Sequence, residues 1–197
     1  MTREATVRRE TKETSIEVVL RLEGGGRVDV TTGIGMLNHM IEQLGRHGGF
    51  DLKVHADGDL HVDAHHTVED IGLALGKALN EALGDRAGIA RMADRTVPLD
   101  EALVHAALDL SGRPYTDIGL RFSAGMAGEL PTPLVAHFFE SFAQEGRFAL
   151  HLRQLAGEND HHIMESAFKA TARALRDAVA VIEAEGGAPS TKGTLSA

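Results

Sequence analysis

Two short stretches of the chain carry paired histidines followed by a glutamate, a set of side chains suited to holding a divalent metal ion. The first stretch, HVDAHHTVED, spans residues 61–70, and the second, GENDHHIMES, spans residues 157–166. In each one the glutamate lies three residues after the second histidine, so on a helix all three side chains belong to about one turn. The recurring residues are His65, His66 and Glu69 in the first stretch, and His161, His162 and Glu165 in the second.

The repetition extends beyond these stretches and organises the whole chain. Residues 38–54 align with residues 136–152 at an offset of 98, which places His39 opposite His137. Two residues drop out afterwards, and the histidine pairs then align at an offset of 96. We interpret this as an internal duplication in which each half supplies three imidazoles and one carboxylate.

The elements that must position these side chains also recur. Residues 16–22 and 104–110 are short apolar runs that end in glycine-containing turns, which is typical of strands. Apolar residues at helical spacing follow in each half, and the alternating segments FDLKVH and FALHLRQ are typical of half-buried strands. Each half is therefore predicted to have roughly the order β-β-α-β-α. Because such a half is too small to bury its helices well, we expect the two to pack together.

The predicted fold is accordingly α+β. It consists of two tandem, similar βα repeats, each a mostly antiparallel four-stranded sheet with two helices, packed as one unit. The repeats are expected at residues 1–91 and 92–184. A tail rich in Gly, Ser and Thr follows at residues 185–197.

Composition narrows the class of protein. The 197 residues include eleven histidines and no cysteine, which excludes disulfides, thiolate nucleophiles and thiolate metal sites. A formal net charge of −9 argues against nucleic acid as a partner. No apolar run approaches the roughly 20 residues that span a bilayer, and the N-terminus lacks the apolar core of a secretory signal. A cytoplasmic protein without a membrane partner is the simplest interpretation.

The histidines and glutamates suffice for two metal shells. Without thiolates, they suit Mn, Fe, Co or Zn with open positions for a substrate better than a closed structural zinc site. Adjacent helical residues diverge by about 100°, so one histidine of each pair should point away from its neighbours. The first expected site contains His39, His66, Glu69 and either His161 or His162. The second expected site contains His137, His65, Glu165 and the remaining member of that pair. Which histidine joins which site stays open.

Several long motifs, in order along nearly the whole chain, resemble one family. They are HHTVED, NDHHIMESAFKA, VPLDEALVHAALDLSGRPY and the terminal PSTKG, which closely resemble the imidazoleglycerol-phosphate dehydratase family of histidine biosynthesis. The resemblance implies two repeats of the ribosomal protein S5 domain 2-like type and two manganese ions per active site. It also implies a homo-oligomer of 24 subunits, built from trimers, with active sites between subunits.

The implied enzyme is a hydro-lyase that converts D-erythro-imidazole glycerol phosphate, a small phosphorylated substrate, to imidazole acetol phosphate. Hydroxide is a poor leaving group, and the neighbouring C–H is not acidic. Two metal ions holding the substrate's own imidazole as an imidazolate would allow its electrons to expel the hydroxyl group through a diazafulvene-like intermediate. A five-membered ring with two nitrogens would explain why the ligand motif occurs twice.

Further residues receive roles from the resemblance and from spacing. Glu13 is the first candidate for proton transfer, ahead of the ligand Glu165, while Asp100 is an acid of unassigned role. The expected substrate-binding residues are Gln43, His47, Arg91, Arg113, Lys169, Ser190 and Lys192. Arginine suits phosphate because its planar donors bind two oxygens at once.

Two departures from the family pattern and two competing functions remain. In the run TPLVAHFF, the residues before His137 are not acidic, although the family tends to carry acidic residues there. Asn38 stands where the family usually has an aspartate before the first ligand histidine, and an aspartate there could orient the imidazole. The competing functions are a dimetal hydrolase, in which Glu13 would serve equally well, and a ferritin-like metal carrier. The carrier is disfavoured because that fold needs four long helices carrying Glu-x-x-His, whereas this chain has His-x-x-Glu.

Overall fold

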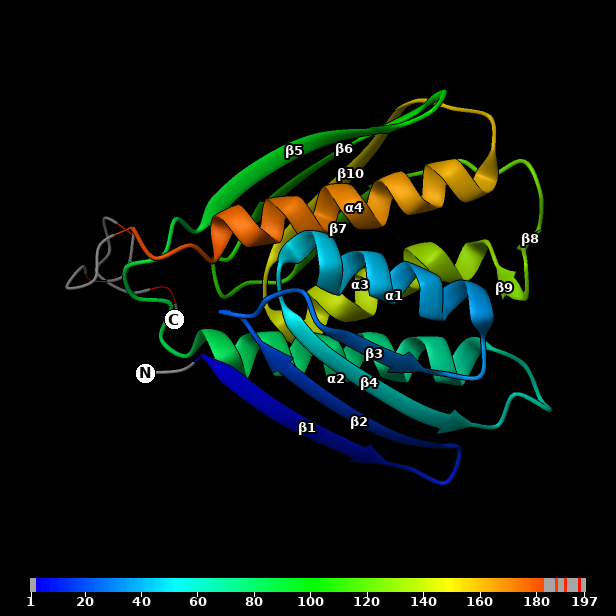
Figure 1. The fold of residues 1–197 in the computed structure, drawn as a ribbon, viewed down its shortest axis with the longest axis horizontal. Helices are drawn as coiled ribbons and strands as arrows, with labels where there is room; N and C mark the ends of the chain where they lie inside the picture. Colours follow the sequence, from blue (N-terminus) through cyan, green and yellow to red (C-terminus); the bar gives the residue numbers. More distant parts are fainter. Residues whose placement is uncertain (1–2, 183–186, 188–189, 191–194, 196–197) are drawn as a thin grey trace.

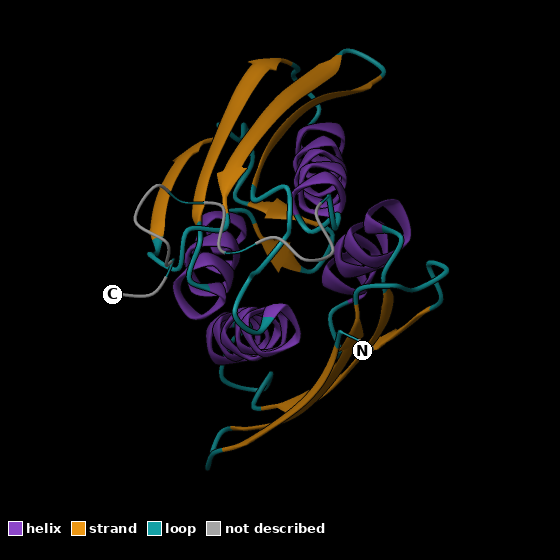
Figure 2. Ribbon diagram, turned by 90° about the vertical axis from the view of Figure 1, so that its left-hand side faces the viewer, coloured by secondary structure: helices purple, strands orange, loops and turns teal. Residues whose placement is uncertain are grey.

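The computed structural model describes residues 3–182 together with Gly187, Ser190 and Leu195. Two four-stranded sheets lie on the outside and four helices lie between them, as Figures 1 and 2 show. The result is a β-α-α-β stack in which each half of the chain supplies one sheet and the two helices that cover it. This confirms the predicted α+β fold with two similar repeats.

The first half forms a sheet with strand order β1-β2-β4-β3, in which the β3–β4 pair is parallel and the others are antiparallel. Helix α1 follows β3 and helix α2 follows β4. The elements are β1 (Glu4–Glu10), β2 (Thr14–Arg21), β3 (Val28–Thr31), α1 (Gly35–Gly48), β4 (Asp51–Gly58) and α2 (His65–Leu83).

The second half repeats this topology with strand order β5-β6-β10-β7, again with one parallel pair, β7 with β10. A two-stranded hairpin, β8–β9, is inserted before its first helix. The elements are β5 (Met92–Leu99), β6 (Ala102–Asp109), β7 (Tyr115–Gly119), β8 (Met126–Ala127), β9 (Leu130–Pro131), α3 (Pro133–Gly146), β10 (Ala149–Ala156) and α4 (Asp160–Ala178).

The expected order β-β-α-β-α was wrong, because three strands of each four-stranded sheet precede the first helix of each repeat, and the second repeat adds the β8–β9 hairpin there. Among the strands that the sequence did not locate are β3 and β7, which pair only with β4 and β10 and form one edge of each sheet. Val28–Thr31 has only four residues and Tyr115–Gly119 has five, with no fully buried position in either. Such short edge strands carry little of the alternating apolar signal that identifies a strand.

The helices of the two halves interlock in pairs. Helix α1 packs against α4, and α2 packs against α3. Two glycines of α2 allow the second pair to approach closely, because a Cβ at Gly72 would lie 2.9 Å from the carbonyl oxygen of Phe138 and one at Gly76 would lie 2.4 Å from that of Phe142. Side chains at these positions would force the helices apart, so the sequence sets the spacing of the ligand-bearing pair α2–α3.

A continuous apolar core joins the sheets to the helix layer. Inward positions of the strands are buried, as in the alternating pattern of β2 and β6. Five phenylalanines of the second half are almost fully buried and pack ring against ring: Phe138, Phe139, Phe142, Phe148 and Phe168. No helix in the described part of the chain is long and apolar enough to span a membrane.

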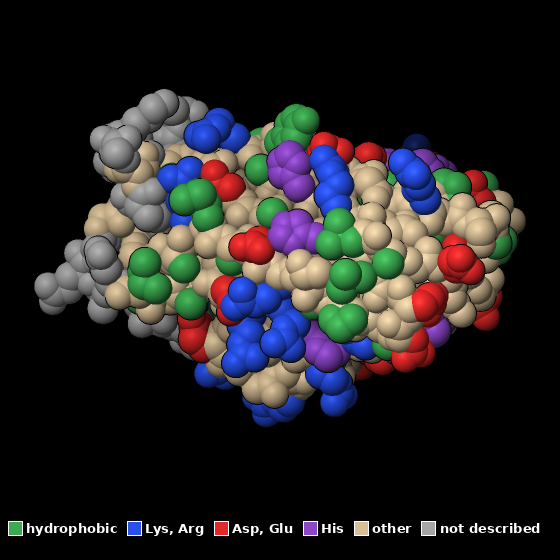
Figure 3. Space-filling model, turned by 90° about the horizontal axis from the view of Figure 1, so that it is seen from above, with side chains coloured by type: hydrophobic (Ala, Val, Ile, Leu, Met, Phe, Trp, Pro, Cys, Tyr) green, Lys and Arg blue, Asp and Glu red, His purple; other side chains and the backbone are tan. Residues whose placement is uncertain are grey.

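The outer faces of the sheets carry mixed side chains. Figure 3 looks at the molecule from the side of the second sheet and shows basic, acidic, histidine and hydrophobic groups intermixed. The N-terminal ends of all four helices lie at one end of the molecule (Figure 1). Because the histidine motifs are located in the first turns of these helices, the fold gathers them at that end.

Candidate metal centre

The first ligand cluster joins the first helix of one half to the second helix of the other. His39 on α1 places its Nε2 atom 3.0 Å from Oε2 of Glu165 on α4, and Nε2 of His161 lies at the same distance from that oxygen. The other carboxylate oxygen of Glu165 contacts the Nζ atom of Lys169 at 2.5 Å. We call His39, His161 and Glu165 the first triad.

The second ligand cluster has the same composition on the other helix pair. His65 and Glu69 come from the first two turns of α2, and His137 comes from α3. The rings of His65 and His137 stack with centroids 4.7 Å apart, and Nε2 of His137 lies 3.4 Å from Oε1 of Glu69. In each cluster the potential ligand atoms lie within 4.8 Å of one another. These residues form the second triad.

The grouping corrects the expected one, which paired His39 with Glu69 and His137 with Glu165. The two carboxylates are exchanged because α1 packs on α4 and α2 packs on α3, so each first-helix histidine faces the glutamate of the other half. The joining of His137 with His65 agrees with the expectation. His161, and not His162, is the partner of His39, since a residue shares a helix face with the one four positions later.

The second histidine of each pair points away from both triads. The rings of adjacent histidines are nearly perpendicular, at 89° for the pair at residues 65 and 66 and 87° for the pair at residues 161 and 162. Nδ1 of His66 lies 3.0 Å from a carboxylate oxygen of Asp59, and Nδ1 of His162 lies 2.7 Å from one of Glu101. These hydrogen bonds raise the pKa of both imidazoles.

Electrostatics favour charged carboxylates at the centre. Burial opposes ionisation of Glu165, but the hydrogen bonds from Lys169 and His39 outweigh it and hold the pKa at about 2. The hydrogen bond with His162, supported by the backbone N–H of Asn159, likewise lowers the pKa of Glu101 to about 2. Both groups are therefore anionic near neutral pH and attract cations.

A chain of polar side chains continues along α1 from the first triad. The Gln43 amide lies 3.4 Å from Nδ1 of His39 and 3.2 Å from Nε2 of His47. Burial and the nearby Lys169 lower the pKa of His47, which favours its neutral form. Gln43 and His47, two of the expected substrate-binding residues, thus lie on the same face of α1 as His39 and contact one another.

The expected proton-transfer residue lies beside the second histidine of the first pair. Oε2 of Glu13 is 3.8 Å from Nδ1 of His66, and Glu13, Asp59 and His66 form a third group of clustered ligand atoms. Asp100, to which the sequence analysis gave no role, is the same distance from the second histidine of the other pair. Its Oδ2 atom lies 3.8 Å from Nε2 of His162.

Two of the residues expected to bind phosphate, Arg91 and Arg113, lie at the opposite end of the strands from the hairpin tips. The Nε and Nη2 atoms of Arg91 donate to the two carboxylate oxygens of Asp109 at 2.7 and 2.9 Å. Arg113 is exposed in the turn after β6, and Ser190 is partly buried. Lys192 lies outside the described residues.

Asn38 does not orient an imidazole. Its side-chain oxygen accepts hydrogen bonds from the backbone N–H of Thr32 at 2.9 Å and from the hydroxyl of Thr32 at 2.6 Å. It therefore fixes the loop that leads into α1, and an aspartate carboxylate could accept the same two bonds.

Two acidic residues of the site were missed by sequence reasoning, namely Asp59 and Glu101. Glu101 lies at the tip of the β5–β6 hairpin, at the place that Glu13 occupies in the β1–β2 hairpin, at an offset of 88. The resemblance of residues 18–30 to residues 106–118, which has this same offset, was the signal that could have identified it.

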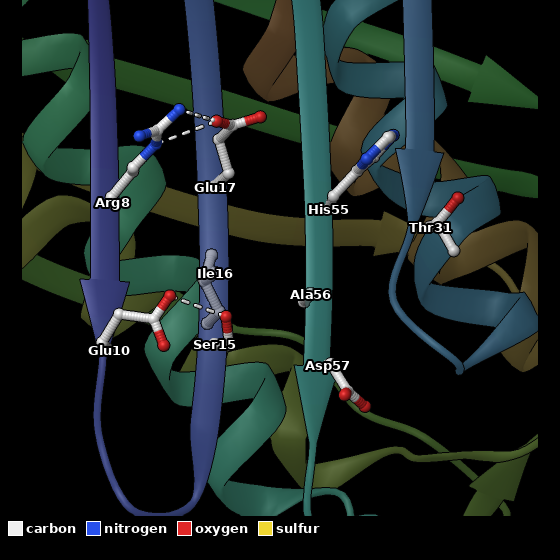
Figure 4. A pocket seen from close by; sticks show the side chains of 9 residues that line it. All are labelled: Arg8, Glu10, Ser15, Ile16, Glu17, Thr31, His55, Ala56 and Asp57. Carbon is white, nitrogen blue, oxygen red and sulfur yellow. Dashed lines mark hydrogen bonds and ion pairs between the residues drawn. The ribbon is translucent and has the colours of Figure 1, made fainter.

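Other hollows of the surface do not compete with the triads. One of about 580 Å³ lies on the outer face of the first sheet. Figure 4 shows its side chains standing on the strands, with Arg8 bonded to Glu17 and Ser15 bonded to Glu10. The ion pair between Arg8 and Glu17 crosses neighbouring strands, which is usual on a solvated sheet face.

The triads fit a bound metal ion. Imidazole nitrogens and a carboxylate converge in both, which is the donor set that divalent first-row metals prefer. The Nε2 atom of His137 is buried and no described residue hydrogen-bonds to it. Since a buried polar atom normally has a partner, this orphaned nitrogen points to a ligand between it and Glu69.

Comparison with known proteins identifies the family. The sequence profile described as imidazoleglycerol-phosphate dehydratase matches residues 32–175. A relative of that name from Parafrankia sp. is 54% identical over 195 residues, covering 99% of this chain and 100% of the relative. The chain belongs to the imidazoleglycerol-phosphate dehydratase family. Imidazoleglycerol-phosphate dehydratase 1, chloroplastic, from Arabidopsis thaliana is 53% identical over 191 residues, covering 96% of this chain and 71% of that protein.

Solved structures of the family share the fold. The crystal structure of the dehydratase from Staphylococcus aureus matches with a TM-score of 0.82 at 31% identity, covering 90% of this chain and 99% of that one. A structure from Pyrococcus furiosus, in complex with (S)-C348, matches with a TM-score of 0.82 at 37% identity, covering 95% and 99%. The chain is a hydro-lyase that acts on a small molecule in the dehydration step of histidine biosynthesis.

Proposed function

We propose that the chain dehydrates D-erythro-imidazole glycerol phosphate to imidazole acetol phosphate with two divalent metal ions, Mn²⁺ by resemblance, held by the two triads. The observation that supports this most strongly is the occurrence of the same ligand set twice, once on each interlocked helix pair. When bound, the two ions act as Lewis acids that hold the substrate's imidazole as its anion, so that its electrons can expel the hydroxyl group.

The histidines outside the triads are proposed to serve a neighbouring subunit. In metal sites, a carboxylate that accepts a hydrogen bond from one ring nitrogen of a ligand histidine leaves the other nitrogen available to the metal. Asp59 and Glu101 stand in that position beside Nδ1 of His66 and His162. Neither histidine joins a triad of its own chain. This arrangement supports active sites between subunits of a homo-oligomer, for which we propose the 24-subunit assembly of trimers.

Glu13 is proposed to transfer the proton. Its carboxylate is half-exposed and stands beside His66, so it can reach a substrate held at the same subunit boundary. Expulsion of hydroxide must be accompanied by loss of the proton from the adjacent carbon, which gives an enol that tautomerises to the ketone. A carboxylate at this place can accept that proton and deliver it during tautomerisation.

The phosphate group is proposed to bind Arg91, Arg113, Ser190 and Lys192. Asp109 accepts hydrogen bonds from Nε and Nη2 of Arg91 and so fixes the plane of the guanidinium group, whose positive charge is proposed to attract the phosphate. Lys169, Gln43 and His47 are proposed to contact the rest of the substrate from the helix faces beside the first triad. We place the reaction in the cytoplasm.

The test is turnover under defined metals. The protein is stripped of metal, reloaded separately with Mn, Fe, Co or Zn, and assayed for the ketone product, with 1,2,4-triazole as an azole inhibitor. The proposal requires product formation that depends on metal, and tight inhibition by the triazole. Metal binding with neither turnover nor azole binding would contradict it and favour a carrier, whereas hydrolysis of a phosphate or amide substrate would favour the dimetal hydrolase.

A further inference from the structure

A buried polar link connects the ligand-bearing helix α2 to the β1–β2 hairpin. Asp70, the residue after Glu69, is only 5% exposed, and one of its oxygens accepts a hydrogen bond from the hydroxyl of Thr14 at 2.5 Å. Its other oxygen pairs with Nη2 of Arg9 on β1 at 2.8 Å. A buried carboxylate of this kind is stable only because both partners are present, so the contact fixes the hairpin against the helix.

The link continues to the tip of the hairpin, where Glu13 lies. The hydroxyl of Thr14 is 3.1 Å from that of Thr11, and the Thr11 hydroxyl accepts the backbone N–H of Glu13 at 3.1 Å. The backbone carbonyl of Glu13 in turn accepts the N–H of Asp59 at 3.0 Å. The backbone of Glu13 is therefore held on both sides, once through the buried aspartate and once through the residue that orients His66.

The second half of the molecule shows that the fold does not need this link. The registers are equivalent, because Arg9 pairs with Ile16 in the first sheet and Val97 pairs with Val104 in the second. The residues at the places of Arg9, Thr14 and Asp70 in the second half are Val97, Ala102 and Ser166.

The corresponding residues of the second half, Val97, Ala102 and Ser166, occupy an equivalent hairpin and helix without a buried charge. Ala102 is 1% exposed, and the buried hydroxyl of Ser166 has no hydrogen-bond partner in the described part of the chain. A small apolar residue and a serine thus suffice for packing at these places. The aspartate, threonine and arginine of the first half need a further reason, and the residue they hold is Glu13.

We propose that Asp70 and Thr14 are positioning residues that hold the Glu13 carboxylate beside His66 for proton transfer. This rests on the proposed function, in which Glu13 moves the proton. Displacement of an acid–base group by about 1 Å can lower a rate as much as a hundredfold, so the fixed backbone at the hairpin tip has a direct consequence for turnover.

The test is a double-mutant cycle in the metal-loaded, full-length protein. Glu13→Gln should lower kcat by at least about 100-fold. Thr14→Ala, which installs the residue of the second half, should lower kcat about tenfold with KM within about twofold, because binding is retained while the acid–base group is misplaced. Thr14→Ser keeps the hydroxyl and should restore kcat to within about twofold of the wild type.

The decisive value is the effect of Thr14→Ala in the Glu13→Gln background, where we expect less than about a twofold further loss. Asp70→Asn should behave in the same way. Thr171→Ala, which removes a buried hydroxyl that donates to the carbonyl of Ala167, is the matched control and should leave kcat unchanged. Thermal unfolding and metal content are measured on every variant. They distinguish an unfolded protein, or a disturbed Glu69 ligand, from a misplaced Glu13 carboxylate.

The outcomes are distinct for the two proposals. Wild-type protein that binds metal but forms no ketone overturns the proposed function and the positioning role with it. Wild-type turnover combined with an equal loss from Thr14→Ala in both backgrounds, or with full activity of Thr14→Ala, overturns the positioning role alone.

Discussion

The two triads have the same three ligand types but different surroundings. Glu165 of the first triad is mostly buried, with 12% of its side chain exposed, and is paired with Lys169. Glu69 of the second has 37% of its side chain exposed, and Leu73 stands where the lysine would be. Duplication preserved the ligands, while the residues one helical turn later diverged.

The first triad already contains a cationic side chain, Lys169, and the second does not. An ammonium group in contact with Glu165 supplies part of the positive charge that a metal ion would bring, so a metal entering the first triad meets a like charge. The second triad has an orphaned His137 nitrogen. We therefore expect the second triad to fill with metal before the first.

The largest effects should come from the carboxylates themselves. Glu165→Gln and Glu69→Gln each remove the anionic ligand of one triad, so each variant should retain about one metal ion where the wild type holds two, and activity should fall at least about 100-fold. Inductively coupled plasma mass spectrometry on gel-filtered protein measures the metal. Glu145→Gln, an exposed residue two turns beyond His137 on α3, is the control and should retain both ions. An unchanged metal content in both Glu165→Gln and Glu69→Gln would show that these glutamates do not hold the metal ions.

Removal of the orienting carboxylates should have the next largest effect. Glu101→Gln and Asp59→Asn leave His162 and His66 without an anionic hydrogen-bond acceptor, which typically lowers metal affinity by about 10- to 100-fold. Competition with a fluorescent chelator gives the affinities. Equal affinities in the variants and the wild type would show that these histidines do not bind metal through the proposed nitrogen.

Replacement of Lys169 should strengthen metal binding at the first triad, whereas the substitutions above weaken metal binding. Lys169→Met leaves Glu165 buried without its cation, so a metal ion in the first triad becomes the partner, and its affinity should rise about tenfold. Isothermal titration with Mn²⁺ should show two separate steps in the wild type that approach one another in the variant. A weaker first site in the variant would mean that the lysine holds the carboxylate in place for the metal.

The smallest expected effect concerns acid stability without metal. The pKa of Glu165 is lowered to about 2 in the folded protein from an ordinary value of 4.5, so ionised Glu165 stabilises the fold above that ordinary value. This contribution should be lost as the pH falls from about 4.5 toward 2. Urea unfolding of the metal-free protein at a series of pH values measures it. Glu165→Gln should lack this part of the pH dependence, and identical curves for the two proteins would contradict the assignment.

Sequence patterns were sufficient for the features that depend on local spacing. The repeat, the helix starts at the histidine pairs and the six triad residues follow from periodicities of three to four and from the fixed offsets, whereas a metal-binding role for His66 and His162 stays a prediction. The exchange of Glu69 and Glu165 between the sites did not follow, because it depends on which helices meet across the middle of the stack. Lys169 lies four residues after Glu165, so the sequence predicted that both side chains share one face of the helix. The packing of α1 against that face could not be predicted from local spacing.

The residues missed by sequence reasoning share a physical cause. Asp59 and Glu101 lie outside helices and strands, where no periodicity marks a side chain as facing the site, and they reach histidines that are 7 and 61 residues away. The sequence analysis gave Asp70 no role of its own and included it only as the last residue of the motif HHTVED. Its partners on β1 and β2 become neighbours only when the hairpin packs on α2.

The most direct test of the two-centre account is a crystal structure of the Mn²⁺-loaded protein with anomalous scattering data. Two metal centres per chain should give two anomalous peaks, one within bonding distance of His39, His161 and Glu165 and one within bonding distance of His65, Glu69 and His137. A single peak, or peaks bonded to neither set of side chains, would contradict the two-centre account.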